Sequence, residues 1–274
     1  MAHLPPERSD VLRCVEPVFH RVIDFLFATI PRPKPHPARL RQCRVVSHRG
    51  EHDNRRILEN TMAAFEVAAS HGVWGIELDI RWTGDLVPVV IHDADLQRVF
   101  GTAAPVAAFH FDGLKARFPQ VPSLEEVVAA FGRRLHLMIE IKKESLPDPS
   151  IQKVRLAEVL SPLIPGVDYH LMSLHPEVFD VFDSAPSVAY LPIARLQVEA
   201  FSRLTLQENY GGITGHYFFI RGKHVRRHRR LGQSIGTGFI GSRNALFREI
   251  NREVEWVYSN RAAYLQSICR GKSA

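Results

Sequence analysis

The chain has 274 residues, of which 45% are hydrophobic and 23% charged, a composition that excludes a disordered or collagen-like protein. Its formal net charge of +6 favours anionic partners, which are nucleic acid, an anionic membrane or phosphorylated small molecules. Three cysteines lie far apart without a C-x-x-C pair, and this argues against a disulfide framework or a cysteine-ligated zinc site.

Membrane-spanning and secretory segments are not expected. No stretch reaches the roughly 18 uninterrupted apolar residues that a spanning helix needs. The first residues also lack the basic start, apolar middle and small-residue cleavage pattern of a secretory signal. We therefore expect a cytoplasmic protein, with peripheral contact to a membrane left open.

The first predicted element is an amphipathic helix from Val11 to Ile30, because apolar residues recur there at helical spacing and charged residues take the other side. Alternating prolines follow between Pro31 and Pro37. They remove amide donors and favour extended backbone, so they predict a stiff connector. We expect residues 1–43 to form this helix and connector, and residues 44–274 to form the folded catalytic domain.

From residue 44 onward, short β-rich runs alternate with helical stretches. Strands are predicted at 45–48, 75–81, 87–92, 135–142, 169–174, 188–193, 234–240 and 255–259, and helices at 60–71, 123–131, 176–182 and 244–251. A further run at 216–220 is interpreted as an excursion between the sixth and seventh units. Eight alternating units in about 230 residues predict a closed (β/α)₈ barrel without a second domain.

Two of the predicted helices carry start signals. Ser123 and Glu126 have the spacing of a capping box, in which each side chain bonds the other residue's backbone amide. Asn60 is expected to cap the helix at 60–71.

Carboxylates share one face of two predicted strands. Alternation in 75–81 places Glu77 and Asp79 on the same face, about 7 Å apart. The same alternation in 135–142 adds Glu140 and Lys142. Inward-pointing carboxylates are costly unless they are neutralised, and oxygen ligands suit Mg²⁺, Ca²⁺ or Mn²⁺ better than zinc or copper.

Histidines end two other predicted strands. His48 follows the first strand and His92 the third, and imidazole can exchange protons near neutral pH. Arg49 and Lys142 are candidates to hold an anion. The alternatives are a core or helix-capping role for His48 and a structural salt bridge between Lys142 and Glu140.

Six segments between residues 47 and 142 resemble the glycerophosphodiester phosphodiesterase family and occur in the family's order. They are Ser47-His48-Arg49-Gly50; Glu59-Asn60-Thr61 with Ala64-Phe65; Ile76-Glu77-Leu78-Asp79-Ile80 followed by Thr83-Gly84-Asp85; Pro88-Val89-Val90-Ile91-His92-Asp93 with Leu96 and Arg98; Pro122-Ser123-Leu124-Glu125-Glu126; and Ile139-Glu140-Ile141-Lys142.

The resemblance implies a metal-dependent (β/α)₈ barrel enzyme that hydrolyses glycerophosphodiesters to sn-glycerol 3-phosphate and an alcohol. In such families the glycerol 2-hydroxyl is thought to attack phosphorus, giving a cyclic phosphate that water opens. The resemblance implies that His48 and His92 form the general acid/base pair and that Glu77, Asp79 and Glu140 bind Mg²⁺ or Ca²⁺. It also implies that Arg49 and Lys142 bind the phosphate and that Glu59 orients one of these groups.

The second half of the chain departs from the family pattern. The family usually has a tryptophan where residues 234–240 read Ser-Ile-Gly-Thr-Gly-Phe-Ile, and an aspartate-bearing loop where Tyr258-Ser259-Asn260-Arg261-Ala262 stands. The loop at 99–120 is also short. A more open site is therefore a hypothesis, and it keeps a lysophospholipase D or sphingomyelinase D-like activity as an alternative. A non-catalytic barrel that binds anionic membrane is a second alternative.

Two segments remain candidates for partner contacts. The basic run from Arg221 to Arg230 is interpreted as a solvated helix face, with an anionic membrane patch as the alternative. No aromatic residues interleave it, so nucleic acid is not an expected partner. The Val11–Ile30 helix is expected to pack on the bottom of the barrel or on a neighbouring subunit, with a membrane interface as the alternative. The sequence does not determine the oligomeric state.

Overall fold

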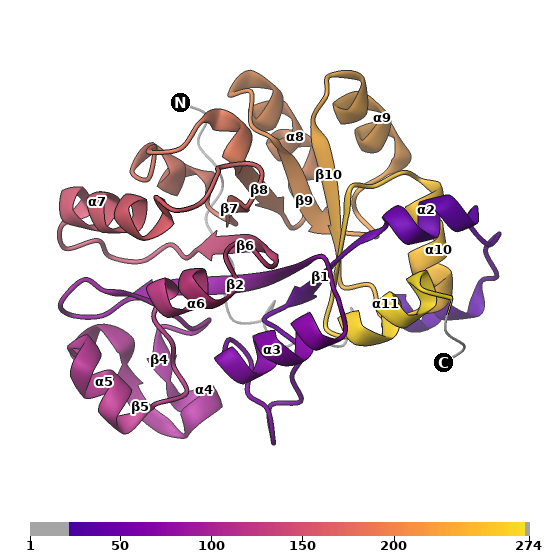
Figure 1. Ribbon diagram of the computed structural model, residues 1–274. Helices are drawn as coiled ribbons and strands as arrows, with labels where there is room; N and C mark the ends of the chain where they lie inside the picture. Colours follow the sequence, from indigo (N-terminus) through magenta and orange to yellow (C-terminus); the bar gives the residue numbers. More distant parts are fainter. Residues whose placement is uncertain (1–21, 272–274) are drawn as a thin grey trace.

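The computed structural model describes residues 22–271, in which eight parallel strands close into a barrel surrounded by helices (Figure 1). In order around the barrel the strands are β1 (Arg44–His48), β11 (Trp256–Ser259), β10 (Ser234–Gly238), β9 (Gly212–His216), β8 (Tyr190–Ala194), β7 (Tyr169–Ser173), β6 (His136–Ile141) and β2 (Gly75–Trp82). Pairing of β1 with β2 completes the circle. The predicted (β/α)₈ barrel is confirmed.

Helices connect these strands on the outside of the barrel. They are α3 (Met62–Ser70), α6 (Leu124–Phe131), α7 (Pro149–Leu160), α8 (Val198–Gln207), α9 (Gly222–Arg230), α10 (Arg243–Asn251) and α11 (Ala262–Cys269), with the 3₁₀ turns η2 (Pro176–Asp180) and η3 (Ser187–Ala189) between β7 and β8. The capping box of Ser123 and Glu126 is confirmed. The expected cap of α3 is wrong, because Thr61 caps this helix.

One predicted barrel strand is not part of the barrel. Residues 87–92 contain β3 (Pro88–Val90), which runs antiparallel to β2 as the second arm of a hairpin. The eighth barrel strand is instead β9, which ends at His216, where the excursion was expected to begin. Gly212 and Gly215 interrupt the apolar pattern of β9, and this hides it from a reading based on hydrophobic runs.

Residues 83–121 form a small lobe beside the barrel, visible at the lower left of Figure 1. Besides β3 it contains β4 (Asp95–Leu96), α4 (Gln97–Phe100), β5 (Thr102–Pro105), η1 (Val106–Ala108) and α5 (Phe111–Arg117). The lobe has its own apolar cluster, formed by Val89, Ile91, Leu96, Val106, Leu114, Phe118 and Val121. The segment expected as a short loop is therefore a packed unit.

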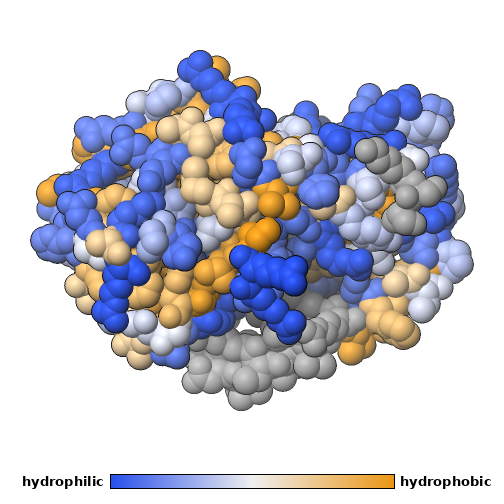
Figure 2. Space-filling model, turned by 60° about the horizontal axis from the view of Figure 1, so that its bottom comes forward, coloured by the Kyte–Doolittle hydropathy of each residue, from blue (hydrophilic) through white to orange (hydrophobic). Residues whose placement is uncertain are grey.

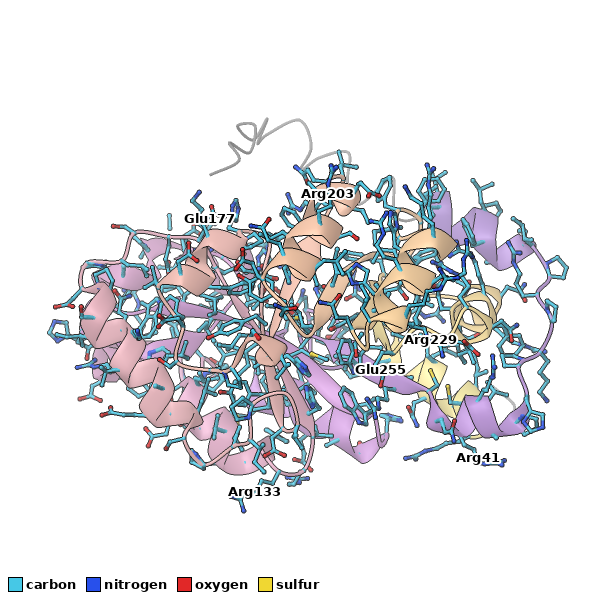
Figure 3. All side chains as sticks on the ribbon, turned by 90° about the horizontal axis from the view of Figure 1, so that it is seen from above. Arg41, Arg133, Glu177, Arg203, Arg229 and Glu255 are labelled. Carbon is cyan, nitrogen blue, oxygen red and sulfur yellow. The ribbon has the colours of Figure 1, made fainter. Side chains whose placement is uncertain are left out.

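Apolar side chains fill the barrel interior below the ends of the strands. A cluster inside the barrel is formed by Val46, Met138, Met172, Leu191, Trp256 and Tyr258. The two ends of the barrel can be located in Figure 3, where Arg41 and Arg133, which precede strands, lie at the lower edge, and Glu177, which follows β7, lies at the upper edge. Because the interior is packed, polar chemistry is confined to the ends.

The segment before β1 crosses from one end of the barrel to the other. Residues 22–29 are helical. In the loop after β10, Gly241 N–H donates to Asp24 at 3.1 Å, and Asn244, at the start of α10, donates to the Ala28 carbonyl at 2.7 Å. The Phe27 ring packs against Tyr217, which follows β9. Six extended residues and α2 (Pro37–Gln42) then lead to β1. The helix therefore lies at the carboxyl end of the barrel, and the expected position at the bottom is wrong.

An extended stretch of six residues spans about 19 Å, which explains how the prolines carry the chain along the barrel side. The Asn251 side chain, at the end of α10, donates to the Pro33 carbonyl at 2.8 Å and fixes this path. Helix α2 was not predicted within the connector. Residues 11–21 of the predicted helix lie outside the described residues.

The basic run from Arg221 to Arg230 forms helix α9, and one side of it is buried. Glu199 pairs with Lys223 at 3.0 Å and with Arg227 at 2.8 Å. His228 is buried between Ser202 and Gln233. Part of this charge is thus neutralised by the protein itself.

Elsewhere the surface is mixed: Figure 2 shows hydrophobic residues in the middle of one face among hydrophilic ones. Within residues 22–271, no helix is both long and apolar enough to cross a membrane.

Candidate active site

Three buried carboxylates converge inside the carboxyl end of the barrel. Glu77 and Asp79 point inward from β2, and Asp79 is paired in register with Glu140 on β6. One oxygen from each of the three lies within 4.8 Å of the others. The predicted convergence of these acids is confirmed, and it follows from the alternation of side chains along two adjacent strands.

Two cations partly neutralise this acidic cluster. Lys142 Nζ lies 2.6 Å from Asp79 Oδ1 and 2.6 Å from Glu140 Oε1, and Arg49 Nε lies 3.2 Å from Asp79 Oδ2. Although burial raises the pKa of Asp79, the charges of Lys142 and Arg49 hold that pKa well below its ordinary value. Burial and the neighbouring carboxylates raise the pKa of Glu77 well above its ordinary value. The cluster thus holds more carboxylate than these two cations balance.

A tight loop after β1 supports these acids. Arg49 has a φ of 57°, and its backbone N–H donates to Glu77 Oε2 at 3.1 Å. The next residue, Gly50, has a φ of 77°, and a Cβ there would lie 2.7 Å from the Cβ of Ala64, so a larger residue does not fit. This explains why glycine follows Arg49 in the loop after β1.

Asn60 belongs to the site and was missed as a functional residue. Its φ is also 57°, and its Nδ2 donates to Asp79 Oδ2 at 2.8 Å. Its backbone N–H donates to the Arg49 carbonyl at 2.9 Å. Asn60 therefore links the loop after β1 to the carboxylate of β2, and the tolerance of asparagine for left-handed backbone was the available signal.

Glu59 holds arginines rather than facing the acidic cluster. It accepts from Arg49 Nη1 at 2.9 Å, from Arg98 Nη2 at 2.5 Å and from Asn54 at 2.6 Å. Although burial raises the pKa of Glu59, the hydrogen bonds of Arg98 and the charge of Arg49 lower it below its ordinary value. Glu59 is thus placed to orient Arg49, and Arg98 is a further site residue that the sequence analysis left without a role.

His48 ends β1 beside the acids. Its Nε2 lies 3.7 Å from Glu77 Oε2, and its Nδ1 lies 2.6 Å from Asn260 Oδ1, in the loop after β11. Burial, followed by the charge of Arg49, lowers the pKa of His48 to about 3, which favours the neutral imidazole. An amide oxygen only accepts, so Nδ1 carries the proton and Nε2 keeps its lone pair.

His92 reaches the same end of the barrel by a different route. It follows β3, and the antiparallel direction of that strand brings it back towards Asp79, where Ile91 N–H donates to the Asp79 carbonyl at 2.9 Å. His92 Nδ1 lies 2.8 Å from Asp93 Oδ1, and Arg98 Nε donates to Asp93 Oδ2 at 2.6 Å. Arg98 also donates to Glu59, which accepts from Arg49, so hydrogen bonds link the partner of His92 to the loop that follows His48.

An aromatic ring lies on the other side of His48. The ring of Phe239, in the loop after β10, is 5.7 Å from the ring of His48 and 5.6 Å from that of His216. Phe239 has a φ of 66°, an uncommon conformation for a bulky residue. Phe239 and Asn260 were not predicted as site residues, although both lie in segments where the sequence departs from the family pattern.

The acidic cluster fits a divalent cation. All three groups offer carboxylate oxygens, the type of ligand that Mg²⁺, Ca²⁺ and Mn²⁺ prefer. Burial, followed by the charges of Asp79 and Glu140, raises the pKa of Glu77, and a cation bound there would offset both effects. These ligands do not distinguish among the three metals.

Fold and site together define a (β/α)₈ barrel with an acidic cluster beside His48 at its carboxyl end. Residues 48–170 match the model of the glycerophosphoryl diester phosphodiesterase family. The resemblance seen in the sequence is thereby confirmed, and residues 48–170 carry this family's domain.

Curated relatives match the same part of the chain. A glycerophosphodiester phosphodiesterase of Caldanaerobacter subterraneus subsp. tengcongensis is 35% identical over 121 residues, which are 40% of this chain and 49% of that protein. Glycerophosphodiester phosphodiesterase 1 of Homo sapiens is 30% identical over 112 residues, 35% of this chain and 33% of that protein. The chain thus matches half or less of the length of these relatives.

Solved structures share the whole barrel. A glycerophosphodiester phosphodiesterase of Thermotoga maritima has a TM-score of 0.70 and 22% identity, covering 82% of this chain and 98% of that one. An Oleispira antarctica phosphodiesterase in complex with the product sn-glycerol-3-phosphate has a TM-score of 0.68 and 19% identity, covering 82% of this chain and 95% of that one. At these identities the likeness establishes the fold.

Proposed function

We propose that this chain hydrolyses glycerophosphodiesters to sn-glycerol 3-phosphate and an alcohol, in a catalytic domain of residues 44–274 that follows the segment 1–43. The observation that carries the proposal is the convergence of three buried carboxylates beside His48, within residues that match the family model. His92 is connected to the same end of the barrel through Asp93, Arg98 and Glu59. In this proposal Glu77, Asp79 and Glu140 hold Mg²⁺ or Ca²⁺, with Mn²⁺ as a further candidate. Cytoplasmic location stays a prediction.

Arg49 and Lys142 are proposed to bind the phosphate of the substrate. Both side chains lie beside Asp79, and together they offer a guanidinium and an ammonium group at the end of the barrel. Charge-assisted hydrogen bonds to phosphate oxygens are strong, and guanidinium geometry suits two oxygens at once. Glu59 then acts as a positioning residue, because its carboxylate binds Nη1 of the Arg49 guanidinium at 2.9 Å.

The two histidines are proposed to move protons in turn. Neutral His48, with Nδ1–H directed at Asn260, has its Nε2 available to accept the proton of the attacking glycerol hydroxyl. His92, held through Nδ1 by Asp93, donates a proton to the leaving alcohol oxygen. The roles reverse when water opens the cyclic phosphate. A bound divalent cation supplies charge that lowers the hydroxyl pKa and offsets the charge on the phosphoryl oxygens.

A release assay over a panel of diesters tests the proposal, with EDTA followed by add-back of Mg²⁺, Ca²⁺ or Mn²⁺. We expect EDTA to abolish turnover and one of these cations to restore it. His48→Ala should lower the rate by on the order of 10²–10⁴ while preserving Ca²⁺-induced stabilisation. His71→Ala, at an exposed position that ends α3, is the matched control. Unchanged turnover in His48→Ala would remove its proposed role.

Two alternatives give different results in the same assay. Turnover of lysophosphatidylcholine without turnover of glycerophosphocholine would indicate a lysophospholipase D or sphingomyelinase D-like enzyme. Vesicle binding without turnover of any diester would indicate a non-catalytic barrel that binds membrane.

A further inference from the structure

The helix at residues 22–29 is apolar on both of its sides. Ile23 and Phe27 face the barrel, where Ile23 is buried and the Phe27 ring packs edge-on against Tyr217 at 5.1 Å. The opposite side exposes four large hydrophobic residues at or directly after the helix, which are Val22 (51% exposed), Phe25 (69%), Leu26 (49%) and Ile30 (43%).

The one charged residue among residues 22–30 is Asp24, which accepts from Gly241. A helix with apolar residues all round is normally covered on every side or in contact with lipid. Water alone therefore does not account for this outer side.

Further exposed apolar residues lie in loops at the carboxyl end of the barrel. Phe218 follows β9 and packs against Phe27 with ring centroids 6.3 Å apart, Phe239 follows β10, and Leu196 follows β8. Seven of the thirteen exposed large hydrophobic residues in the described part of the chain belong to this helix, the residue after it and these loops. We name these seven the rim apolar surface: Val22, Phe25, Leu26, Ile30, Leu196, Phe218 and Phe239. A concentration of this kind marks an interaction site rather than scattered surface residues.

The rim apolar surface reaches the candidate active site. Phe239 is both part of this surface and 5.7 Å, ring to ring, from His48. His216 stacks on Phe239 and on Tyr217, which contacts Phe27, so a continuous series of rings joins the site to the helix. His216 and Tyr217 are buried, so the exposed apolar surface that an alkyl chain on a bound phosphate would meet beside His48 is that of Phe239.

Two arginines lie close to this helix and to the loop that binds it. The Arg32 guanidinium lies 6.0 Å from the Phe27 ring, and Arg261 donates to the carbonyl of Gly241, the residue that also binds Asp24. Arginines at the edge of an apolar helix suit phospholipid phosphates, because the aliphatic stems lie on apolar groups while the guanidinium reaches the headgroups.

We propose that the rim apolar surface docks on a phospholipid membrane and delivers phosphodiesters bearing an acyl chain, the lysophospholipid class, to the active site. The proposed membrane docking depends only on the rim apolar surface, whereas the proposed delivery of substrate rests on the proposed function. A protein covering this surface would also cover Phe239 beside His48, whereas a lipid surface supplies the substrate there. A second copy of the chain and residues 1–21 are the other candidate occupants.

The binding arm uses the full chain carrying His48→Ala and sedimentation with vesicles of phosphatidylcholine containing a minority of phosphatidylglycerol. Adding Phe25→Ser and Leu26→Ser should weaken vesicle partitioning by at least about tenfold, because each removes a large apolar side chain from the contact. The matched control is Val154→Ser with Ile164→Ser, two exposed apolar residues away from this surface. Equal partitioning of the two double variants would overturn the docking.

The turnover arm uses the same double variants with His48 intact. Phe25→Ser with Leu26→Ser should lower turnover of lysophosphatidylcholine in vesicles by about the same factor and leave soluble glycerophosphocholine turnover unchanged, since neither residue is part of the site. Turnover of lysophosphatidylcholine that is insensitive to these changes would overturn the delivery. A chain that binds vesicles through these residues but hydrolyses no diester would refute the proposed function and leave the docking intact.

Two further measurements separate the other occupants. Sedimentation velocity should give the same molecular mass for the wild type and Phe25→Ser with Leu26→Ser. Conversion of a dimer to a monomer by these changes would overturn the proposal in favour of an interface between copies. A lowered melting temperature without a change in vesicle binding would overturn it in favour of coverage by residues 1–21.

Discussion

Replacement of Lys142 by Met tests the acidic cluster without relying on turnover. Lys142 Nζ bonds both Asp79 and Glu140 at 2.6 Å, and its side chain is 9% exposed. Methionine keeps much of the apolar stem but removes the charge, so the metal-free cluster keeps Arg49 as its one adjacent cation among the described residues. Removal of one partner of a buried ion pair costs about 3–5 kcal/mol.

The expected shift is large enough for a thermal melt. In a chain of this size each kcal/mol changes the melting temperature by about 2–4 °C, so Lys142→Met should melt roughly 6–20 °C below the wild type in EDTA. A cation that binds only the folded protein, at a concentration 100 times its dissociation constant, raises the free energy of unfolding by about 2.7 kcal/mol. Ca²⁺ or Mg²⁺ should therefore stabilise the variant more than the wild type, in which Lys142 competes for the same oxygens.

Circular dichroism melts with EDTA, Ca²⁺ and Mg²⁺ measure both effects. Lys143→Met is the matched control, because Lys143 is exposed and pairs with Glu177 at the surface, where such pairs contribute about 0–1 kcal/mol. The reasoning would be refuted if Lys142→Met and the control had the same melting temperature in EDTA. It would also be refuted if neither cation raised the melting temperature of Lys142→Met more than that of the wild type.

Three further predictions concern single side chains. Because the pKa of Glu77 is raised in the folded state, the stability of the metal-free protein should fall as pH rises from the ordinary pKa of 4.5 towards the raised value. Glu77→Gln should therefore have a higher melting temperature than the wild type at alkaline pH in EDTA, and Ca²⁺ should no longer raise its melting temperature. If Ca²⁺ still raised it, Glu77 would not be a ligand. Asn260→Ala removes the acceptor of His48 Nδ1–H, so we expect kcat to fall about 10- to 100-fold while the melting temperature stays unchanged. Nitrogen NMR should then show equal populations of the two His48 tautomers. An unaltered kcat would disprove the orienting role of Asn260. Ser123→Ala should lower the free energy of unfolding in urea by about 0.5–2 kcal/mol without affecting turnover, whereas no change would mean that the capping box contributes nothing.

Local patterns predicted the acidic cluster because charged residues alternate with apolar ones in β2 and β6, and strand geometry then fixes which side chains face inward. Asn260 and Phe239 lie far from His48 in the sequence, and they meet it only because the barrel closes between β1 and β11 with β10 as the next strand. No local pattern carries that information. The direction of β3 was missed for a related reason, since the same apolar run suits a parallel or an antiparallel neighbour.

The N-terminal helix shows another limit of local patterns. Its periodicity identified a helix, but the position of that helix depends on contacts with loops more than 190 residues later, such as that of Asp24 with Gly241. The proline connector was predicted to be extended, and its reach along the barrel side became evident only from the fold.

The position of His92 on a hairpin outside the barrel bears on how the protein responds to partial unfolding. His48 is anchored in the barrel wall, whereas His92 and its partner Asp93 belong to a lobe held by a separate apolar cluster around Leu96 and Leu114. The proposed acid/base pair is therefore drawn from the barrel and from this lobe. Under the proposed function, loosening of the lobe misaligns His92 while the barrel stays native, so we expect inactivation to precede global denaturation.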